Sequence, residues 1–269
     1  MQSFAEAERS GWERNAARYD SLVGPATNQG IGPIFDRIGD LAGKRLLDIA
    51  CGTGDLAGAA AARGAQVDAI DFAAPMIEAA RTKIANASFQ VADCLDLPYA
   101  DETFDAVTCC FGLLHVADNA AAMAQAARVL KPGGKIAYTA WCSPQDGGAF
   151  LGMVFGTFGK HADMEVELPP APPMFELADA TRSAELLTQA GFTDVASDRF
   201  EVSWTAPDAD GVAAILNDGL VRAGLILRAQ TPERRAQVLA ALADAARPHV
   251  TGNGFAMTNS ALLVTATKR

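Results

Sequence analysis

The chain has 269 residues, half of them hydrophobic, enough to bury the core of one large α/β domain. With 22 basic against 32 acidic residues its net charge is −10, which argues against nucleic acids and anionic membranes as partners. Five cysteines without a CxxC pair, three scattered histidines, a polar N-terminus and no apolar run of membrane-spanning length predict a reduced, cytoplasmic protein without a metal site.

The first 42 residues are expected to form a helical cap. Residues 3–23 predict a helix, because apolar side chains recur on one of its faces: Trp12, Ala16, Tyr19 and Val23. A Gly- and Pro-rich connection follows over residues 24–33, and a short helix over residues 34–42.

From Lys44 onward, strands and helices alternate, which predicts right-handed βαβ units and a parallel sheet. Five apolar stretches are the expected strands: residues 44–50, 66–71, 88–93, 103–112 and 134–141. The helices between them are expected at residues 54–64, 74–85 and 119–134, the last one stopped by Pro132 and the glycines. Residues 43–142 are thus the expected cofactor-binding core.

Residues 143–180 interrupt this alternation. They carry paired glycines, a Phe- and Met-bearing stretch and the proline cluster "LPPAPPMF". This composition favours an inserted active-site cover over a plain surface insertion. A helix that begins after Thr231 and a last strand over residues 260–268 place the rest of the sheet in residues 181–269. The whole chain is expected to be a single domain.

The stretch "LLDIACGTGDLAG", residues 46–58, runs from a strand through a glycine turn into a helix. Gly52 and Gly54 fit a relaxed dinucleotide fingerprint, and Asp71 ends the next strand, where an acid can hold a ribose. The same turn suits S-adenosylmethionine (SAM), because backbone N–H groups at its helix can receive the carboxylate of the methionine end. Phe72 and Met76 can form an apolar wall for the adenine. The turn alone leaves nicotinamide cofactors and SAM open.

Downstream motifs decide between the two cofactors. "LDIACGTG", the acid of "DAIDFA", "ADCLDLPY…FDAV", "FGLLHVAD" and "RVLKPGG" follow one another between Leu46 and Trp141. In this order they resemble the class I SAM-dependent methyltransferases, most of all the group that includes the ubiquinone/menaquinone-biosynthesis C-methyltransferases. The resemblance implies a Rossmann-like, seven-stranded, mostly parallel sheet with helices on both faces. Its last strand is expected to be antiparallel and to lie beside the fifth.

The resemblance also implies roles for single residues. Asp48 and the glycine turn lie under the methionine moiety, Asp71 holds the ribose, and Asp93 accepts from the adenine amino group. The full set of expected contacts to SAM, or to its product S-adenosylhomocysteine (SAH), is Tyr19, Asp48, Ala50, Gly52, Gly54, Asp71, Phe72, Met76, Asp93, Cys94, Leu95 and Phe111.

The expected function is methyl transfer from SAM to a small, hydrophobic or aromatic metabolite, at carbon or oxygen rather than nitrogen, by a monomer or homodimer. His115 is a candidate general base or substrate contact, with packing at the pocket wall as the alternative. The expected substrate residues are Trp12, His115, Trp141, Phe150 and Met174. His115 and the insertion depart from the quinone-biosynthesis enzymes, so the acceptor stays open. Two other functions also stay open: a SAM- or SAH-binding protein without methyl transfer, and a nicotinamide oxidoreductase.

Overall fold

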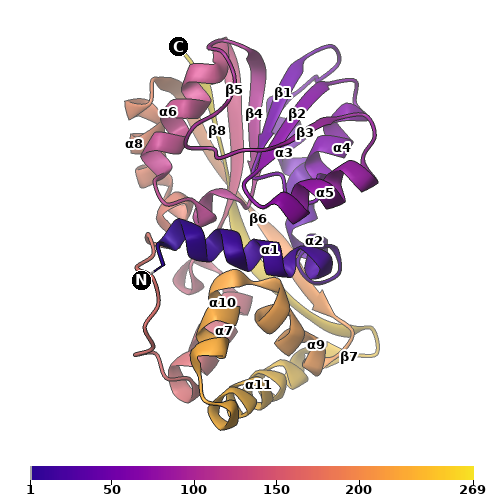
Figure 1. The fold of residues 1–269 in the computed structure, drawn as a ribbon, viewed down its shortest axis with the longest axis vertical. Helices are drawn as coiled ribbons and strands as arrows, with labels where there is room; N and C mark the ends of the chain where they lie inside the picture. Colours follow the sequence, from indigo (N-terminus) through magenta and orange to yellow (C-terminus); the bar gives the residue numbers. More distant parts are fainter. Residues whose placement is uncertain (1) are drawn as a thin grey trace. The chain divides into compact units, whose positions relative to one another are not determined.

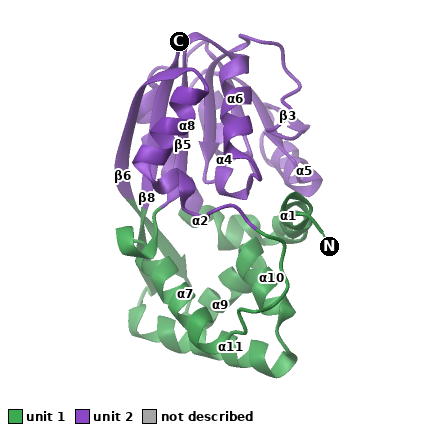
Figure 2. Ribbon diagram, turned by 90° about the vertical axis from the view of Figure 1, so that its left-hand side faces the viewer, with its two compact units in different colours: residues 1–26, 142–170, 201–260 green, residues 27–141, 171–200, 261–269 purple. Residues whose placement is uncertain are grey.

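The structure is a computed structural model that describes residues 2–269, and the chain divides into two compact units. The first, here called the sheet unit, comprises residues 27–141, 171–200 and 261–269 (Figure 2). The second unit comprises residues 1–26, 142–170 and 201–260. The expected single domain, with its boundaries near residues 42, 142 and 180, stays a prediction.

The sheet has the strand order β3-β2-β1-β4-β5-β8-β6 (Figure 1). Strands β1 to β5 pair in parallel, whereas β8 runs antiparallel to β5, with Tyr138 opposite Val264. This arrangement confirms the predicted Rossmann-like fold and its antiparallel last strand. The strands are β1 (Arg45–Ile49), β2 (Gln66–Asp71), β3 (Ser88–Val91), β4 (Phe104–Cys110), β5 (Leu130–Trp141), β6 (Phe192–Ala206) and β8 (Gly254–Lys268).

Five helices belong to the sheet unit: α3 (Ile31–Ile38), α4 (Asp55–Ala61), α5 (Ala74–Lys83), α6 (Asn119–Val129) and α8 (Ala180–Gln189). One face of the sheet packs against α3, α4 and α5 in a continuous apolar cluster, whose strand members include Leu46, Val67, Ala69, Phe89 and Ala137. α6 and α8 lie next to each other (Figure 1). Because strands of a parallel sheet are buried on both faces, their sequences are nearly continuous apolar runs.

Two local predictions were wrong. The Gly- and Pro-rich connection forms the helical turn α2 (Gly24–Thr27) and a 3₁₀ turn (Asn28–Gly30) rather than irregular chain. The helix expected to continue to Pro132 ends at Val129, and the "KPGG" motif lies within β5. The reason is a competing set of hydrogen bonds, because Glu102 N–H and Thr103 N–H donate to the last carbonyls of α6, at Arg128 (3.0 Å) and Val129 (2.8 Å).

The second unit is mainly helical. Its elements are α1 (Phe4–Leu22), α7 (Ala149–His161), α9 (Ala209–Ala214), a π-helix (Ile215–Gly219), α10 (Val221–Ala229), α11 (Pro232–Ala246) and the short strand β7 (Val250–Thr251). α1 packs closely on this group, because Gly11 leaves room for Val221 and Asn15 Nδ2 donates to the Gly219 carbonyl at 3.2 Å. The helix predicted to begin after Thr231 is confirmed as α11, with Thr231 as its N-cap, since Thr231 Oγ1 accepts from Arg234 N–H. Part of the expected cover, residues 149–161, is the helix α7.

Within residues 2–269, no helix combines the length and the hydrophobicity that crossing a bilayer requires.

Candidate cofactor site at the ends of β1, β2 and β4

The turn after β1 is built on three residues with positive φ: Ala50 (52°), Gly52 (54°) and Gly54 (86°). A Cβ on Gly54 would lie 2.9 Å from two ring carbons of Phe89, so the turn passes too close to β3 for any side chain. Hydrogen bonds from Cys51 N–H to Ile70 O (2.9 Å) and from Gly54 N–H to Cys51 O (3.0 Å) fix its shape. The result is a bare backbone surface directly before α4.

Asp71, the last residue of β2, faces this turn. Its side chain is 7% exposed, and its two oxygens accept from Gly52 N–H and Ala73 N–H, each at 2.9 Å. Burial raises the pKa of this carboxyl, although the hydrogen bonds from Ala73 and Gly52 and the charge of His115 favour its ionised form. A carboxylate can accept up to about four hydrogen bonds, so Asp71 can also accept from a ligand hydroxyl such as a ribose supplies.

Asp48 is a second buried carboxyl in this site, on β1. It is 1% exposed; its Oδ1 accepts from Thr108 Oγ1 at 3.0 Å, whereas its Oδ2 has no hydrogen-bond partner among the described residues. Burial, with a contribution from the charge of Asp71, raises the pKa of Asp48 to about 8. A buried carboxyl oxygen without a donor is costly, and a cationic ligand would remove that cost.

Asp93 begins a tight turn after β3. Its Oδ1 accepts from Leu95 N–H at 2.9 Å and its carbonyl from Asp96 N–H at 3.1 Å. The turn starts beside Asp71, because Ala92 N–H donates to the Asp71 carbonyl at 3.1 Å. Asp93, and with it Cys94 and Leu95, therefore follows the strand next to that of Asp71.

The loop after β4 closes on the loop after β1. A Cβ on Gly112 would lie 2.5 Å from the Cβ of Ala50, so the two strand ends touch. Phe111 has a positive φ of 58°, which Phe rarely adopts, and its N–H donates to Thr139 Oγ1 at 3.0 Å. Its ring stacks on Trp141 with centroids 3.8 Å apart. His115 follows in a 3₁₀ turn, with its N–H bonded to Gly112 O.

The remaining predicted residues lie in different environments. Within the sheet unit, Met76 and Cys94 are buried, Phe72 and Leu95 are half-buried, and Met174 is 36% exposed. Burial raises the pKa of the Cys94 thiol to about 12, which argues for packing rather than nucleophilic chemistry. No group of three His, Cys, Asp or Glu side chains within residues 2–269 is arranged to hold a metal ion.

Three predicted residues belong to the second unit. Trp12 and Tyr19 meet edge to face on α1, with centroids 5.8 Å apart. Phe150 is fully buried and stacks on Trp204 at 4.6 Å, an environment that favours a packing role. Their predicted contacts with cofactor or substrate stay predictions.

Two threonines of this site escaped the sequence analysis. Thr108 lies opposite Asp48 in the register of β1 and β4 and donates to it. Thr139 of β5 holds the backbone of Phe111. Only the strand register, a long-range property, brings either residue to the site, so no local motif could have indicated them.

The donors and acceptors of this site fit SAM. The unpartnered Oδ2 of Asp48 suits an ammonium group, and the buried carboxyl of Asp71 suits a ribose hydroxyl. The site lies outside the carboxyl ends of β1 and β4, where the strand order reverses and ligands of open α/β sheets bind.

Comparison with known proteins agrees with this fit. A family described as a methyltransferase domain matches residues 47–138. A demethylmenaquinone methyltransferase of Clavibacter sepedonicus is 41% identical over 128 residues, which cover 46% of this chain and 49% of that protein. A demethylmenaquinone methyltransferase of Thermus thermophilus is 38% identical over 171 residues, which cover 54% of this chain and 78% of the relative. The chain belongs to the class I SAM-dependent methyltransferases.

Within this methyltransferase family, the chain is similar to the ubiquinone/menaquinone-biosynthesis group, as the motifs predicted. The predictions of enzyme class and of SAM as the family's cofactor are confirmed, and the nicotinamide alternative is wrong. The YcgJ protein from Bacillus subtilis shares the fold, with a TM-score of 0.59 at 19% identity over 90% of this chain and 99% of that chain. The chain spans about half the length of the Clavibacter relative and of a further relative of the same name.

Proposed function

We propose that this methyltransferase transfers the methyl group of SAM to a carbon or oxygen atom of a small, hydrophobic or aromatic acceptor. The observation that carries the proposal is the pair of buried carboxyls at the glycine turn, Asp48 with a free oxygen and Asp71 with both oxygens held by backbone N–H groups. The names of the relatives make a demethylated naphthoquinol ring the first acceptor to test.

The roles of the cofactor residues follow from their surroundings. Asp48 would hold the ammonium of the methionine end, Asp71 the two ribose hydroxyls, and Asp93 the adenine amino group. Phe72 and Met76 would line the adenine, with Cys94 and Leu95 on the turn that Asp93 begins. When bound, SAM supplies an electrophilic methyl group on a sulfonium.

The chain then has to align the acceptor. Phe111 and Trp141 form a stacked aromatic pair beside the contact of Ala50 with Gly112, and such a surface suits a flat apolar ring. Near-attack alignment of two reactants can supply roughly 7–11 kcal/mol of the barrier, and an apolar wall excludes water. His115 lies four residues after Phe111, and we assign it the contact with the acceptor's hydroxyl, whose proton it would take.

The alternative, a protein that binds SAM or SAH without methyl transfer, uses the same pocket. The names of the relatives favour transfer. Methylated product formed in proportion to SAH distinguishes the two, because a binding protein forms neither.

Thermal unfolding with SAH, SAM and NADH, each added alone, tests the cofactor. A ligand at a hundred times its dissociation constant should stabilise the fold by about 2.7 kcal/mol. We expect shifts with SAH and SAM, none with NADH, and none with SAH in Asp71→Asn. Mass spectrometry of reactions with SAM and a demethylated naphthoquinol, or a series of aromatic hydroxy compounds, then identifies the acceptor. A shift with NADH alone, or SAH binding without product across the whole series, contradicts the proposal.

A further inference from the structure

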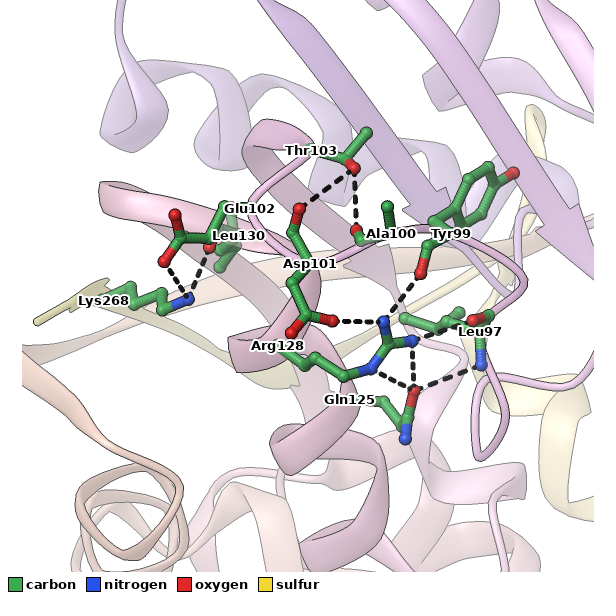
Figure 3. Close-up of polar contacts among 10 residues, drawn as sticks. All are labelled: Leu97, Tyr99, Ala100, Asp101, Glu102, Thr103, Gln125, Arg128, Leu130 and Lys268. Atoms are coloured by element: carbon green, nitrogen blue, oxygen red, sulfur yellow. Dashed lines mark hydrogen bonds and ion pairs between the residues drawn. The ribbon is translucent and has the colours of Figure 1, made fainter.

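Arg128, in the last turn of α6, directs its guanidinium at the chain segment that precedes β4 and at Gln125 of the same helix (Figure 3). Its Nη1 donates to the Tyr99 carbonyl at 2.7 Å and to the Asp101 carboxylate at 2.9 Å. Its Nη2 donates to the Leu97 carbonyl at 2.8 Å and to Gln125 Oε1 at 2.8 Å, and its Nε donates to the same Gln125 oxygen at 3.2 Å. A guanidinium has five N–H donors, so each of them has an acceptor here.

Leu97 is the residue that this network holds most completely. Its carbonyl accepts from Arg128, and its N–H donates at 3.3 Å to Gln125 Oε1, the oxygen that Arg128 also binds (Figure 3). Its side chain is buried. α6 therefore fixes both backbone groups of Leu97 through one glutamine and one arginine.

Leu97 also ends the turn that begins at Asp93. At its start, this turn is tied to β2 by the bond from Ala92 N–H to the Asp71 carbonyl. In its middle, the Asp93 side chain and carbonyl accept from Leu95 and Asp96. At its end, the backbone of Leu97 is hydrogen-bonded to Gln125 and Arg128 of α6. The turn thus has two anchors, and Gln125 and Arg128 together supply the distal one.

The ion pair with Asp101 does not explain why an arginine is needed at this position. The Asp101 side chain is 73% exposed, and an ion pair in water contributes little to stability. The Arg128 side chain is only 31% exposed, and it reaches two carbonyls two residues apart in the same loop. A lysine has a single ammonium on a flexible stem, which cannot bridge these acceptors as a planar fork does.

We infer that Arg128 is a positioning residue for adenine recognition: by fixing Leu97 it holds the Asp93 carboxylate where it accepts the adenine amino group. The role is indirect, since Arg128 acts through Leu97 and not by a contact of its own with the cofactor. The inference rests on the proposed function, because the contact between Asp93 and adenine belongs to that proposal. It adds Arg128, a residue of α6, to the determinants of base selectivity.

The test compares SAH with S-inosylhomocysteine, in which a carbonyl oxygen replaces the adenine amino group. Calorimetry of the full chain gives the ratio of the two dissociation constants, a quantity that a uniform loss of stability or affinity does not change. In the wild type, SAH should bind at least about tenfold more tightly than S-inosylhomocysteine, because one hydrogen bond to a carboxylate corresponds to a factor of about that size. Asp93→Asn should reduce this preference, and Arg128→Met should reduce it to a similar level.

Three further variants make the result specific. Arg128→Lys keeps the charge beside Asp101, so it should fold with little loss of stability and still lose the preference. Asp101→Asn removes the ion pair but leaves the bonds to Leu97 and Tyr99, so it should keep the wild-type preference. In the double variant of Arg128→Met and Asp93→Asn, the preference should not fall below that of the single variants, because both act through one contact.

Each failure has a separate meaning. A wild type that does not bind SAH refutes the proposed function and this inference with it. A wild type that binds both ligands equally refutes the role of Asp93. A normal wild-type preference that Asp93→Asn removes, but that Arg128→Lys and Arg128→Met retain, refutes the positioning role of Arg128 alone.

Discussion

Replacing Gly54 by alanine should destabilise the sheet unit through two separable effects. The first is backbone strain, because Gly54 lies in the left-handed region with φ 86° and ψ 16°, where a Cβ costs about 1–2 kcal/mol. The second is a clash, because the new Cβ would lie 2.9 Å from Phe89 Cε1 and Cζ and 3.2 Å from Ala80 Cβ. Phe89 is buried, so its ring cannot move into solvent, and overpacking of this kind costs about 1–3 kcal/mol.

Gly191→Ala is the matched control. Gly191 also has a positive φ, 94°, but no atom lies within 4 Å of the Cβ that alanine would add. It should therefore lose about 1–2 kcal/mol from strain alone, whereas Gly54→Ala should lose about 2–5 kcal/mol. Urea unfolding followed by circular dichroism measures both free energies, and SAH titration should show weakened binding in Gly54→Ala only. Equal losses in the two variants would mean that Phe89 yields to the new methyl group, and the account of the glycine turn as a fixed cradle would be wrong.

Three further predictions concern the buried carboxyls and the aromatic wall. Because burial raises the pKa of Asp48 from 3.8 to about 8, its protonation stabilises the folded state fully below pH 4, and this stabilisation is lost as the pH rises towards 8. Asp48→Asn should therefore flatten the dependence of the free energy of unfolding on pH over that range, as urea unfolding at a series of pH values measures. Asp71, whose pKa is also raised, keeps part of the slope in the variant. Thr108→Val removes the donor to Asp48 Oδ1, so it should lower the free energy of unfolding by about 1–3 kcal/mol; an unchanged value would show that the 3.0 Å bond contributes nothing. Trp141→Ala removes the ring stacked on Phe111, so the fold increase in the acceptor's KM should exceed the fold increase in the Kd of SAH at least about tenfold. Equal fold increases in the two constants would contradict an acceptor-binding role.

The sheet could be predicted from the sequence because its determinants are local. Each strand is a short, mainly apolar run, and the turns that lead into α4 and α5 carry Gly54, which permits a positive φ, and Pro75, which fixes φ for the first helical turn. The end of α6 was misplaced for the opposite reason. Proline and glycine at 132–134 are strong local signals, but the carbonyls of Arg128 and Val129 are taken by N–H groups of the loop before β4, so the strand begins two residues before the proline.

The candidate site could be predicted from the sequence only where its residues, like the strands, belong to local motifs. Asp48, Asp71 and Asp93 each end or precede a motif that can be read along the chain, and parallel strands bring their carboxyl ends to one edge. Thr108 carries no such signal, and Arg128, although it opens the "RVLKPGG" motif, carries none that points to Leu97. Threonine in a strand and arginine near a helix end are both ordinary, and only the pairing of β1 with β4 and the docking of α6 give these two residues their partners.

The distribution of strain supports the assignment of the site independently of any motif. Four non-glycine residues within residues 2–269 have a positive φ, and two of them, Ala50 and Phe111, lie at the ends of β1 and β4, where Gly112 packs against Ala50. The same edge of the sheet holds the unpartnered oxygen of Asp48 and the buried carboxyl of Asp71. Strained backbone and buried polar atoms without partners each lower the stability of the folded protein. Their concentration where the ends of β1 and β4 meet suits a ligand site, because ligand binding there can recover free energy that folding alone does not.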